Sequence, residues 1–145
     1  MMSNEGHFVD ANVLIYAAVQ VDLRHARCLK LLTDETGETL FVSSQILTEF
    51  YSVITSSRKV TSPLTPEAAA DFIEVLLSSS HVVLVPILAD VSTRLLSLLR
   101  RHPVRGARIF DFQIAATMLA LGITKLLTFN GRDFTSIIEI ATFEP

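Results

Sequence analysis

The sequence predicts an α/β fold in which helices cover both faces of a parallel or mostly parallel sheet. Two observations indicate this class: short apolar runs alternate with amphipathic stretches of helical periodicity, and helix start and stop signals separate them. With 145 residues, half of them hydrophobic, the chain is long enough for one compact domain, residues 1–145, and short for two. We find no repeat, low-complexity tract or linker.

Two strands and three helices are expected before residue 60. Residues 8–10 indicate a buried strand that leads into a helix from about Asn12, and residues 24–33 have the apolar spacing of a second helix. Residues 39–43 are the second predicted strand, and Ser44 suits the N-cap of the third helix. The apolar stripe of that helix consists of Ile46, Leu47, Phe50, Val53 and Ile54.

Two further predicted helices flank the third predicted strand in the sequence. Thr65 supplies a capping hydroxyl before a proline and an early acid, so a helix is expected to begin there. The β-branched residues 81–85 form the strand, which Pro86 ends. Asp90 is expected to cap the helix that follows.

The alternation continues to the end of the sequence. Asp111 is expected to open a helix that ends at Gly122. Residues 125–129 form a strand, Asn130 and the glycine after it suit a turn, and residues 137–143 are a candidate for a short final strand.

Composition limits the function classes. The formal net charge of −3 does not match the basic surface typical of nucleic-acid binding, so such a site must be a local patch or depend on metal ions. The single cysteine, Cys28, is interpreted as a buried core thiol because it lies in an apolar helical pattern. No His and Cys arrangement indicates a nucleophile or a zinc site.

Targeting signals are not evident. Polar residues near the start precede only a short apolar run, which does not suit a signal peptide. The apolar runs 13–19 and 82–89 are far shorter than the roughly 20 residues that a membrane span needs. We therefore expect a cytoplasmic protein without a membrane partner.

Two acids of the first half of the chain are candidates for a functional site. Asp10 lies inside an apolar segment, where an uncompensated charge is costly, although a helix N-cap also explains it. Asn12 could orient Asp10 or cap the helix itself. Glu49 is the only acid between Glu38 and Glu67 and lies beside the apolar stripe of its helix; a solvated boundary residue is the alternative.

Two acids of the second half complete the set. Asp111 begins an apolar stripe that Ile114, Ala115 and Met118 continue. A role as helix N-cap alone would not require Asp111 to lie on this buried side of the helix. Asp133 follows the last long strand in a loop, where a turn residue is the alternative interpretation, as it is for Asn130.

All four acids fall where the carboxyl edge of a parallel sheet is expected, which is the edge where ligands bind in such folds. Like charges gathered in one site oppose joint ionisation, and a divalent cation removes that conflict. Oxygen ligands without soft ones favour Mg²⁺ or Mn²⁺ over zinc.

Four ordered motifs, from Phe8 to about Phe134, resemble the PIN-domain ribonucleases, in particular the VapC-type toxins of bacterial toxin–antitoxin pairs. The motifs are Phe-Val-Asp10-Ala-Asn12-Val-Leu-Ile-Tyr-Ala, Ser-Ser-Gln-Ile-Leu-Thr-Glu49-Phe, Asp111-Phe-Gln-Ile-Ala-Ala-Thr-Met-Leu and Thr128-Phe-Asn130-Gly-Arg-Asp133-Phe. Each motif alone is weak, and their order at this chain length makes the resemblance specific.

The resemblance implies a three-layer α/β/α sandwich with a mostly parallel sheet of four or five strands. It also implies an Mg²⁺ or Mn²⁺ site in which Asp10 and Asp111 bind the principal ion, Glu49 binds it or positions the attacking water, and Asp133 supports a second or transient ion. Behind these ligands we expect Asn12, Thr128 and Asn130.

The activity implied is endoribonuclease cleavage of single-stranded or loop RNA by a metal-activated water, leaving a 5′-phosphate. A cognate antitoxin protein and a homodimer are the implied partners. Arginines that precede Asp111 are the candidate phosphate-facing patch, with a solvated loop as the equal alternative. The candidate RNA contacts are Arg101, Arg105 and Arg108.

Three other functions remain open at this point. The first is a non-catalytic module of the same fold that binds RNA or a protein. The second is a phosphatase with Asp10 as its nucleophile, which would favour a second acid where this chain has Asn12. The third is a DNA-directed nuclease, which nothing in the sequence separates from an RNA-directed one.

Overall fold

Five short strands form one fully parallel sheet in the computed structural model, which describes residues 4–145. Their order across the sheet is β3-β2-β1-β4-β5. The strands are β1 (His7–Val9), β2 (Leu40–Val42), β3 (Val82–Leu84), β4 (Lys125–Leu127) and β5 (Ala141–Phe143). The expectation of a parallel sheet of four or five strands is confirmed.

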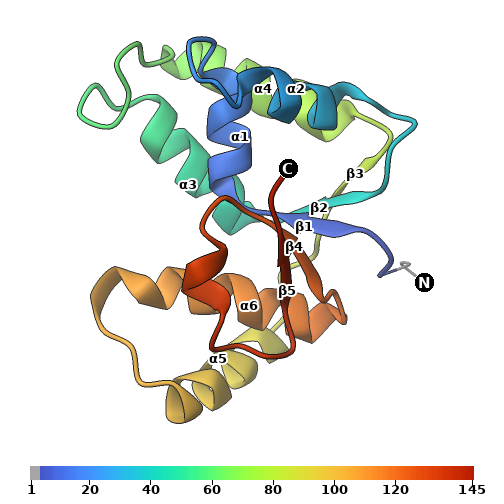
Figure 1. Cartoon of the computed structure of the whole chain (residues 1–145), viewed down its shortest axis with the longest axis vertical. Helices are drawn as coiled ribbons and strands as arrows, with labels where there is room; N and C mark the ends of the chain where they lie inside the picture. Colours follow the sequence, from blue (N-terminus) through green and yellow to red (C-terminus); the bar gives the residue numbers. More distant parts are fainter. Residues whose placement is uncertain (1–3) are drawn as a thin grey trace.

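Helices cover both faces of this sheet, as Figure 1 shows. One layer contains α1 (Ala11–Ala18), α2 (His25–Thr33), α3 (Ser44–Ile54) and α4 (Pro66–Ser78), and the other contains α5 (Asp90–Arg101) and α6 (Ile109–Leu121). The chain adds β2 and β3 on one side of β1 and then returns to place β4 on the other. Since crossovers between parallel strands are right-handed, this reversal moves the helices to the opposite face. The three-layer prediction is confirmed.

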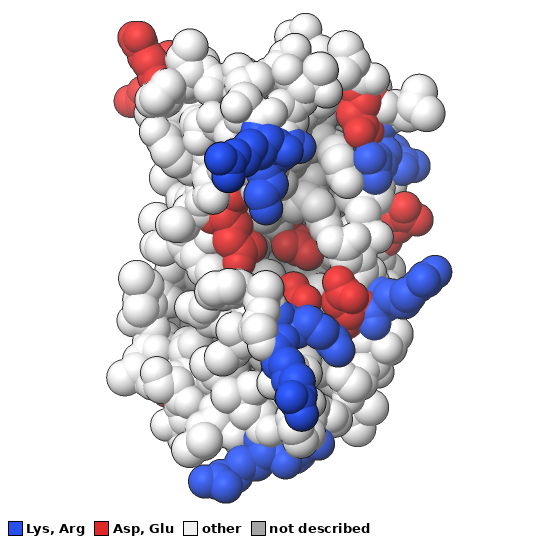
Figure 2. All heavy atoms as spheres, turned by 90° about the vertical axis from the view of Figure 1, so that its left-hand side faces the viewer, with Lys and Arg blue, Asp and Glu red and all other residues white. Residues whose placement is uncertain are grey.

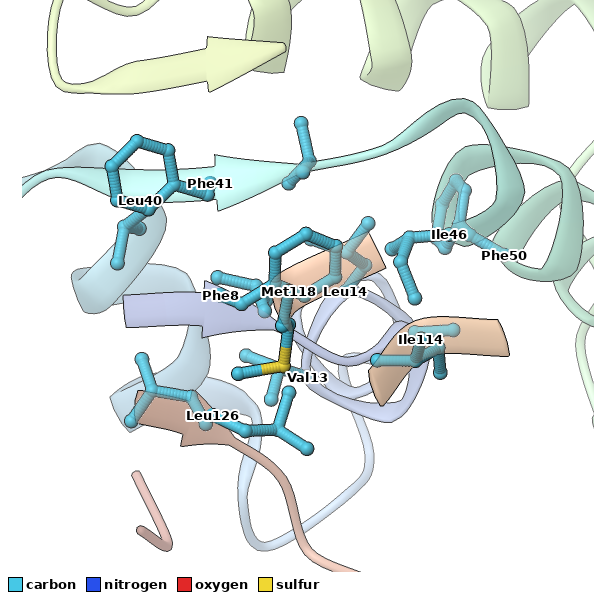
Figure 3. Close-up of a cluster of buried hydrophobic side chains, with 14 of the residues drawn as sticks. Phe8, Val13, Leu14, Leu40, Phe41, Ile46, Phe50, Ile114, Met118 and Leu126 are labelled. Atoms are coloured by element: carbon cyan, nitrogen blue, oxygen red, sulfur yellow. The ribbon is translucent and has the colours of Figure 1, made fainter. Parts of the chain in front are cut away.

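The core lies on both sides of the sheet (Figure 3). Phe8 and Phe41 of the strands are fully buried, as are Phe50 of α3 and Met118 of α6. Helix α6 is apolar nearly all round because it packs against the sheet on one side and α5 on another. Cys28 is fully buried, as predicted. None of the helices within residues 4–145 has both the length and the apolar composition to cross a membrane.

Several element boundaries differ from the sequence prediction. Ser43, not Ser44, caps α3: its backbone is still extended from β2, so its hydroxyl accepts the Ile46 N–H at 3.3 Å. Asp90 is the first residue of α5 and not its cap, and its carboxylate instead pairs with Arg94 one turn later, at 3.0 Å. The caps at Thr65 and Gly122 are confirmed.

The elements around the last two acids are also shifted. A 3₁₀ turn, η1 (Gly106–Arg108), leads into α6, so the helix starts before Asp111, which lies within its first turn. Strand β4 ends two residues earlier than predicted, and the expected turn at Asn130 is the start of a second 3₁₀ helix, η2 (Gly131–Phe134).

Candidate functional site

A cleft of about 840 Å³ opens at the carboxyl ends of the strands. Its acidic lining residues are Asp10, Glu49 and Asp111, and the amides of Asn12 and Asn130 line it as well. Asp10 follows β1, next to β4, where the strand order reverses and open α/β sheets bind ligands. On the face shown in Figure 2, carboxylates gather in and beside a central hollow, with Lys and Arg side chains above and below it.

Asp10 joins the end of β1 to the end of β4. Its Oδ1 accepts the Ala11 N–H at 2.7 Å as the cap of α1, and its Oδ2 accepts the Thr128 hydroxyl at 2.8 Å. The side chain is 7% exposed. Burial raises the pKa of Asp10, the hydrogen bonds from Thr128 and Ala11 oppose that rise, and the nearby Asp133 charge adds to it. Asp10 is therefore the N-cap of α1, as one of the two interpretations predicted, and it also lines the cleft.

The residues expected behind Asp10 form one hydrogen-bonded corner. Asn12 donates through Nδ2 to the Thr128 hydroxyl at 3.3 Å and to Asp10 Oδ2 at 3.5 Å, and its Oδ1 accepts the Phe129 N–H at 3.3 Å. The Thr128 hydroxyl also accepts the Asn130 N–H at 3.0 Å. Asn12 thus orients Asp10 and the loop after β4 and does not cap α1, while Asn130 joins the corner through its main chain.

Glu49 faces the cleft from α3 and is half-buried. Burial raises the pKa of Glu49, a hydrogen bond from Gln45 opposes the rise, and the Asp10 charge adds to it. Gln45 donates through Nε2 to Glu49 Oε1 at 2.9 Å and also to the Phe110 carbonyl at 2.9 Å. Gln45 was not among the residues predicted from the sequence, although its position one turn before Glu49 is a signal for such a pair.

Asp111 is the least compensated carboxylate of the set. Burial, followed by the charges of Asp10, Asp133 and Glu49, raises the pKa of Asp111 to about 6, and Arg108 opposes this only in part. Within residues 4–145, no hydrogen bond reaches its carboxylate and no cation pairs with it. Its position in the first turn of α6 is one where the helix dipole favours a negative charge.

Asp133 lies in η2 and does not line the cleft, unlike the other three acids. Its charge nevertheless raises the pKa of both Asp10 and Asp111, so Asp133 lies within electrostatic reach of these two acids.

The donor set fits a hard divalent cation in its chemistry, since it offers carboxylates, amides and a hydroxyl without His or Cys. The arrangement is open, however. Across residues 4–145, no three acidic, His or Cys side chains converge tightly enough to hold a metal ion as they stand. Binding an ion therefore requires side-chain adjustment, for which the half-exposed Glu49 and Asp111 have room.

The candidate RNA-contacting arginines differ in their surroundings. Arg101 pairs with Glu139 at 2.9 Å, and Arg108 donates to the Asp133 carbonyl at 3.1 Å. Arg105 is exposed just before η1. Lys59, in the loop after α3, is the only cation among the described residues that line the cleft.

Comparison with known proteins places these features in a family context. The PIN domain model matches residues 7–139. The fold is similar to the VapC20 toxin of Mycobacterium tuberculosis, which cleaves the sarcin–ricin loop, with 22% identity, a TM-score of 0.69, and coverage of 95% of this chain and 98% of that one. Curated proteins give no significant match.

Two further solved structures share the fold. VapBC2 from Rickettsia felis, bound to a promoter DNA fragment, matches with 20% identity and a TM-score of 0.66 over 95% of this chain and 97% of that one. VapBC-1 from nontypeable Haemophilus influenzae matches with 18% identity and a TM-score of 0.62 over 95% of this chain and 96% of that one. At these identities the likeness establishes a common fold.

Proposed function

The chain belongs to the PIN domain family, and from this premise we propose that it is a metal-dependent endoribonuclease, the toxin of a type II toxin–antitoxin pair. One observation supports the proposal most directly. Acids from four separate segments lie in or beside one cleft, where burial and the charges of Asp10, Asp133 and Glu49 raise the pKa of Asp111, and none of the described cations forms an ion pair with Asp111. Such a cluster is costly for folding and suits a site for divalent cations.

The proposed ligands of an Mg²⁺ or Mn²⁺ ion are Asp10 and Asp111, with Glu49 as a third ligand or as the residue that positions the attacking water. Asp133 would support a second or transient ion. When bound, such an ion supplies an activated water and offsets charge on the attacked phosphate. The protein's own contribution is orientation, because donors on both oxygens of Asp10 hold its carboxylate in one position.

Substrate binding is proposed to use the cations around the cleft. Lys59 lines it, and Arg105 and Arg108 lie at η1, just before the helix that contains Asp111. Contacts of this kind bind the phosphate backbone and position it without reading sequence. The proposed reaction is hydrolysis of single-stranded or loop RNA to leave a 5′-phosphate.

The test uses the purified full chain with total RNA, with Mn²⁺ or with a chelator. We expect cleavage with Mn²⁺ only, and no cleavage by folded Asp10→Asn or Asp111→Asn variants. Full activity in chelator, or undiminished activity of either variant, would reject the metal mechanism. Single-stranded DNA in the same assay separates an RNA-directed from a DNA-directed enzyme.

The toxin assignment rests on the fold shared with VapBC complexes. It predicts growth arrest when the chain is expressed alone in the cytoplasm and relief when a small neighbouring gene, the proposed antitoxin, is co-expressed. Homodimer formation is part of this proposal, and light scattering of the purified chain tests it.

A non-catalytic binding module is the second candidate, and one observation favours it. No three acidic side chains in residues 4–145 converge on a single point. This module would fold and bind RNA or a protein, yet calorimetry would detect no binding of Mn²⁺ and no condition would give cleavage.

A further inference from the structure

Gln45 joins two of the acid-bearing segments of the cleft. Its side-chain nitrogen lies 2.9 Å from Glu49 Oε1, within α3, and 2.9 Å from the carbonyl oxygen of Phe110, in the first turn of α6. Phe110 directly precedes Asp111. One amide group therefore connects the carboxylate on α3 to the backbone that supports the carboxylate on α6.

The orientation of this amide is fixed by its partners. An ionised carboxylate and a backbone carbonyl can only accept hydrogen bonds, so the nitrogen of Gln45 has to face both. The side-chain oxygen is then turned away from them, and it is buried without a hydrogen-bond partner among the described residues. A buried, unpartnered carbonyl costs stability. An apolar side chain of similar size would avoid that cost, so stability alone does not explain a glutamine here.

We propose that Gln45 is a positioning residue, which acts through Glu49 by holding its carboxylate beside the first turn of α6 and towards the metal site. The inference rests on the proposed function, because it assigns Gln45 a role at that same site. Glu49 is half-buried and has several rotatable bonds, and the negative charge of Asp10 acts on it. A donor anchored on the α6 backbone offsets that repulsion and limits the rotamers that Glu49 samples.

The chain offers a matched control for this role. Gln113, on α6, lines the same cleft and is also partly buried. No hydrogen bond joins its side chain to any of the described residues, and its backbone carbonyl accepts the Thr117 hydroxyl. Replacing either glutamine by methionine keeps the length of the side chain and removes its amide.

The experiment measures Mn²⁺ affinity by titration calorimetry and thermal unfolding without metal, on the full chain. We expect Gln45→Met to weaken Mn²⁺ binding about 10-fold or more, as for other residues that orient metal ligands, while Gln113→Met changes it less than about twofold. The melting temperature of metal-free Gln45→Met should equal or exceed that of the wild type. Gln45→Leu serves as a second variant in case methionine packs poorly.

A double-mutant cycle separates positioning from a general structural role. In a Glu49→Gln background, Gln45→Met should cause no further loss of Mn²⁺ affinity, because Gln45 acts through the Glu49 carboxylate. A loss that persists in that background overturns the inference, as does unchanged affinity of folded Gln45→Met while the wild type binds Mn²⁺. A wild-type chain that binds no Mn²⁺ and cleaves no RNA overturns the proposed function together with this inference.

Discussion

At the strand side of the cleft, Asp10 is buried and receives hydrogen bonds on both oxygens from Ala11 and Thr128. At the helix side, Glu49 and Asp111 are half-exposed, one amide reaches Glu49, and no hydrogen bond from the described residues reaches Asp111. The strand side is therefore ordered before any ligand binds. The helix side keeps uncompensated charge, so we expect the adjustment on metal binding to occur there.

The corner behind Asp10 is the part whose disruption should have the largest effect on folding. Thr128→Val removes the hydroxyl that donates to Asp10 and accepts from Asn12 and Asn130, in a residue that is 2% exposed. Because buried partners lose their hydrogen bonds, we expect the free energy of unfolding to fall by about 1–3 kcal/mol, measured by urea denaturation.

The matched control for this substitution is Thr117→Val in α6. Thr117 is also buried, but its hydroxyl donates only to the Gln113 carbonyl one turn earlier, a bond that contributes little to helix stability. Equal losses in the two variants would show that the strand-side corner is no more tightly ordered than an ordinary helix, and would remove the basis of the comparison.

The fold was predictable because its main signals are local. Alternating apolar runs and the Thr65 and Gly122 caps indicated the layers and most elements. The predicted boundaries of helices and strands were wrong where a tertiary contact decides them. Two serines in succession suit the start of α3, and only the extent of the pairing of β2 selects Ser43. Similarly, β4 ends at Leu127 because the hydroxyl of the next residue, Thr128, accepts the Asn130 N–H in the following loop.

The acidic cluster was predictable for a different reason. A charge within or beside an apolar pattern is conspicuous in a sequence. Asp10, Glu49 and Asp111 were therefore expected at the carboxyl edge of the sheet, and all three line the cleft. Asp133 was expected with them and lies beside the cleft instead, since the first turn of η2 sets its position. The contact of Gln45 with the main-chain oxygen of Phe110 could not be predicted from the residue types, because the two residues are 65 positions apart in the sequence.

The charge on the helix side should be visible in the pH dependence of stability without metal. The pKa of Asp111 rises from 3.8 to about 6 on folding, and those of Asp10 and Glu49 rise as well. Between about pH 4 and pH 6 these three carboxyls thus hold more protons in the folded chain than in the unfolded chain, so their contribution to the free energy of unfolding falls as pH increases. Since Asp111 is half-exposed, we expect its share to be about 1 kcal/mol or less.

Asp111→Asn should flatten this part of the profile and raise stability at pH 7, measured by urea denaturation at a series of pH values in chelator. Added Mg²⁺ should then stabilise the wild type at pH 7 but not the variant, since a ligand of the folded state is lost. If the free energy of unfolding of the variant had the same slope against pH as that of the wild type between pH 4 and pH 6, the charge of Asp111 would be no less compensated than the charge of Asp10.

The smallest expected effect concerns Lys59, the one cation among the described residues that line the cleft. Lys59→Ala, studied in the inactive Asp10→Asn background, should weaken single-stranded RNA binding a few-fold and lower the slope of log affinity against log salt by about 0.7, the value for one lost phosphate contact. Arg58 is the control, because it is an exposed neighbour that does not line the cleft, and Arg58→Ala should leave the slope unchanged. Equal changes in both variants would instead indicate general attraction to a basic loop. A change specific to Lys59 would show that the RNA backbone binds on the side of the cleft that contains the uncompensated carboxylates. Binding there requires a cation, because the phosphates and the carboxylates repel each other.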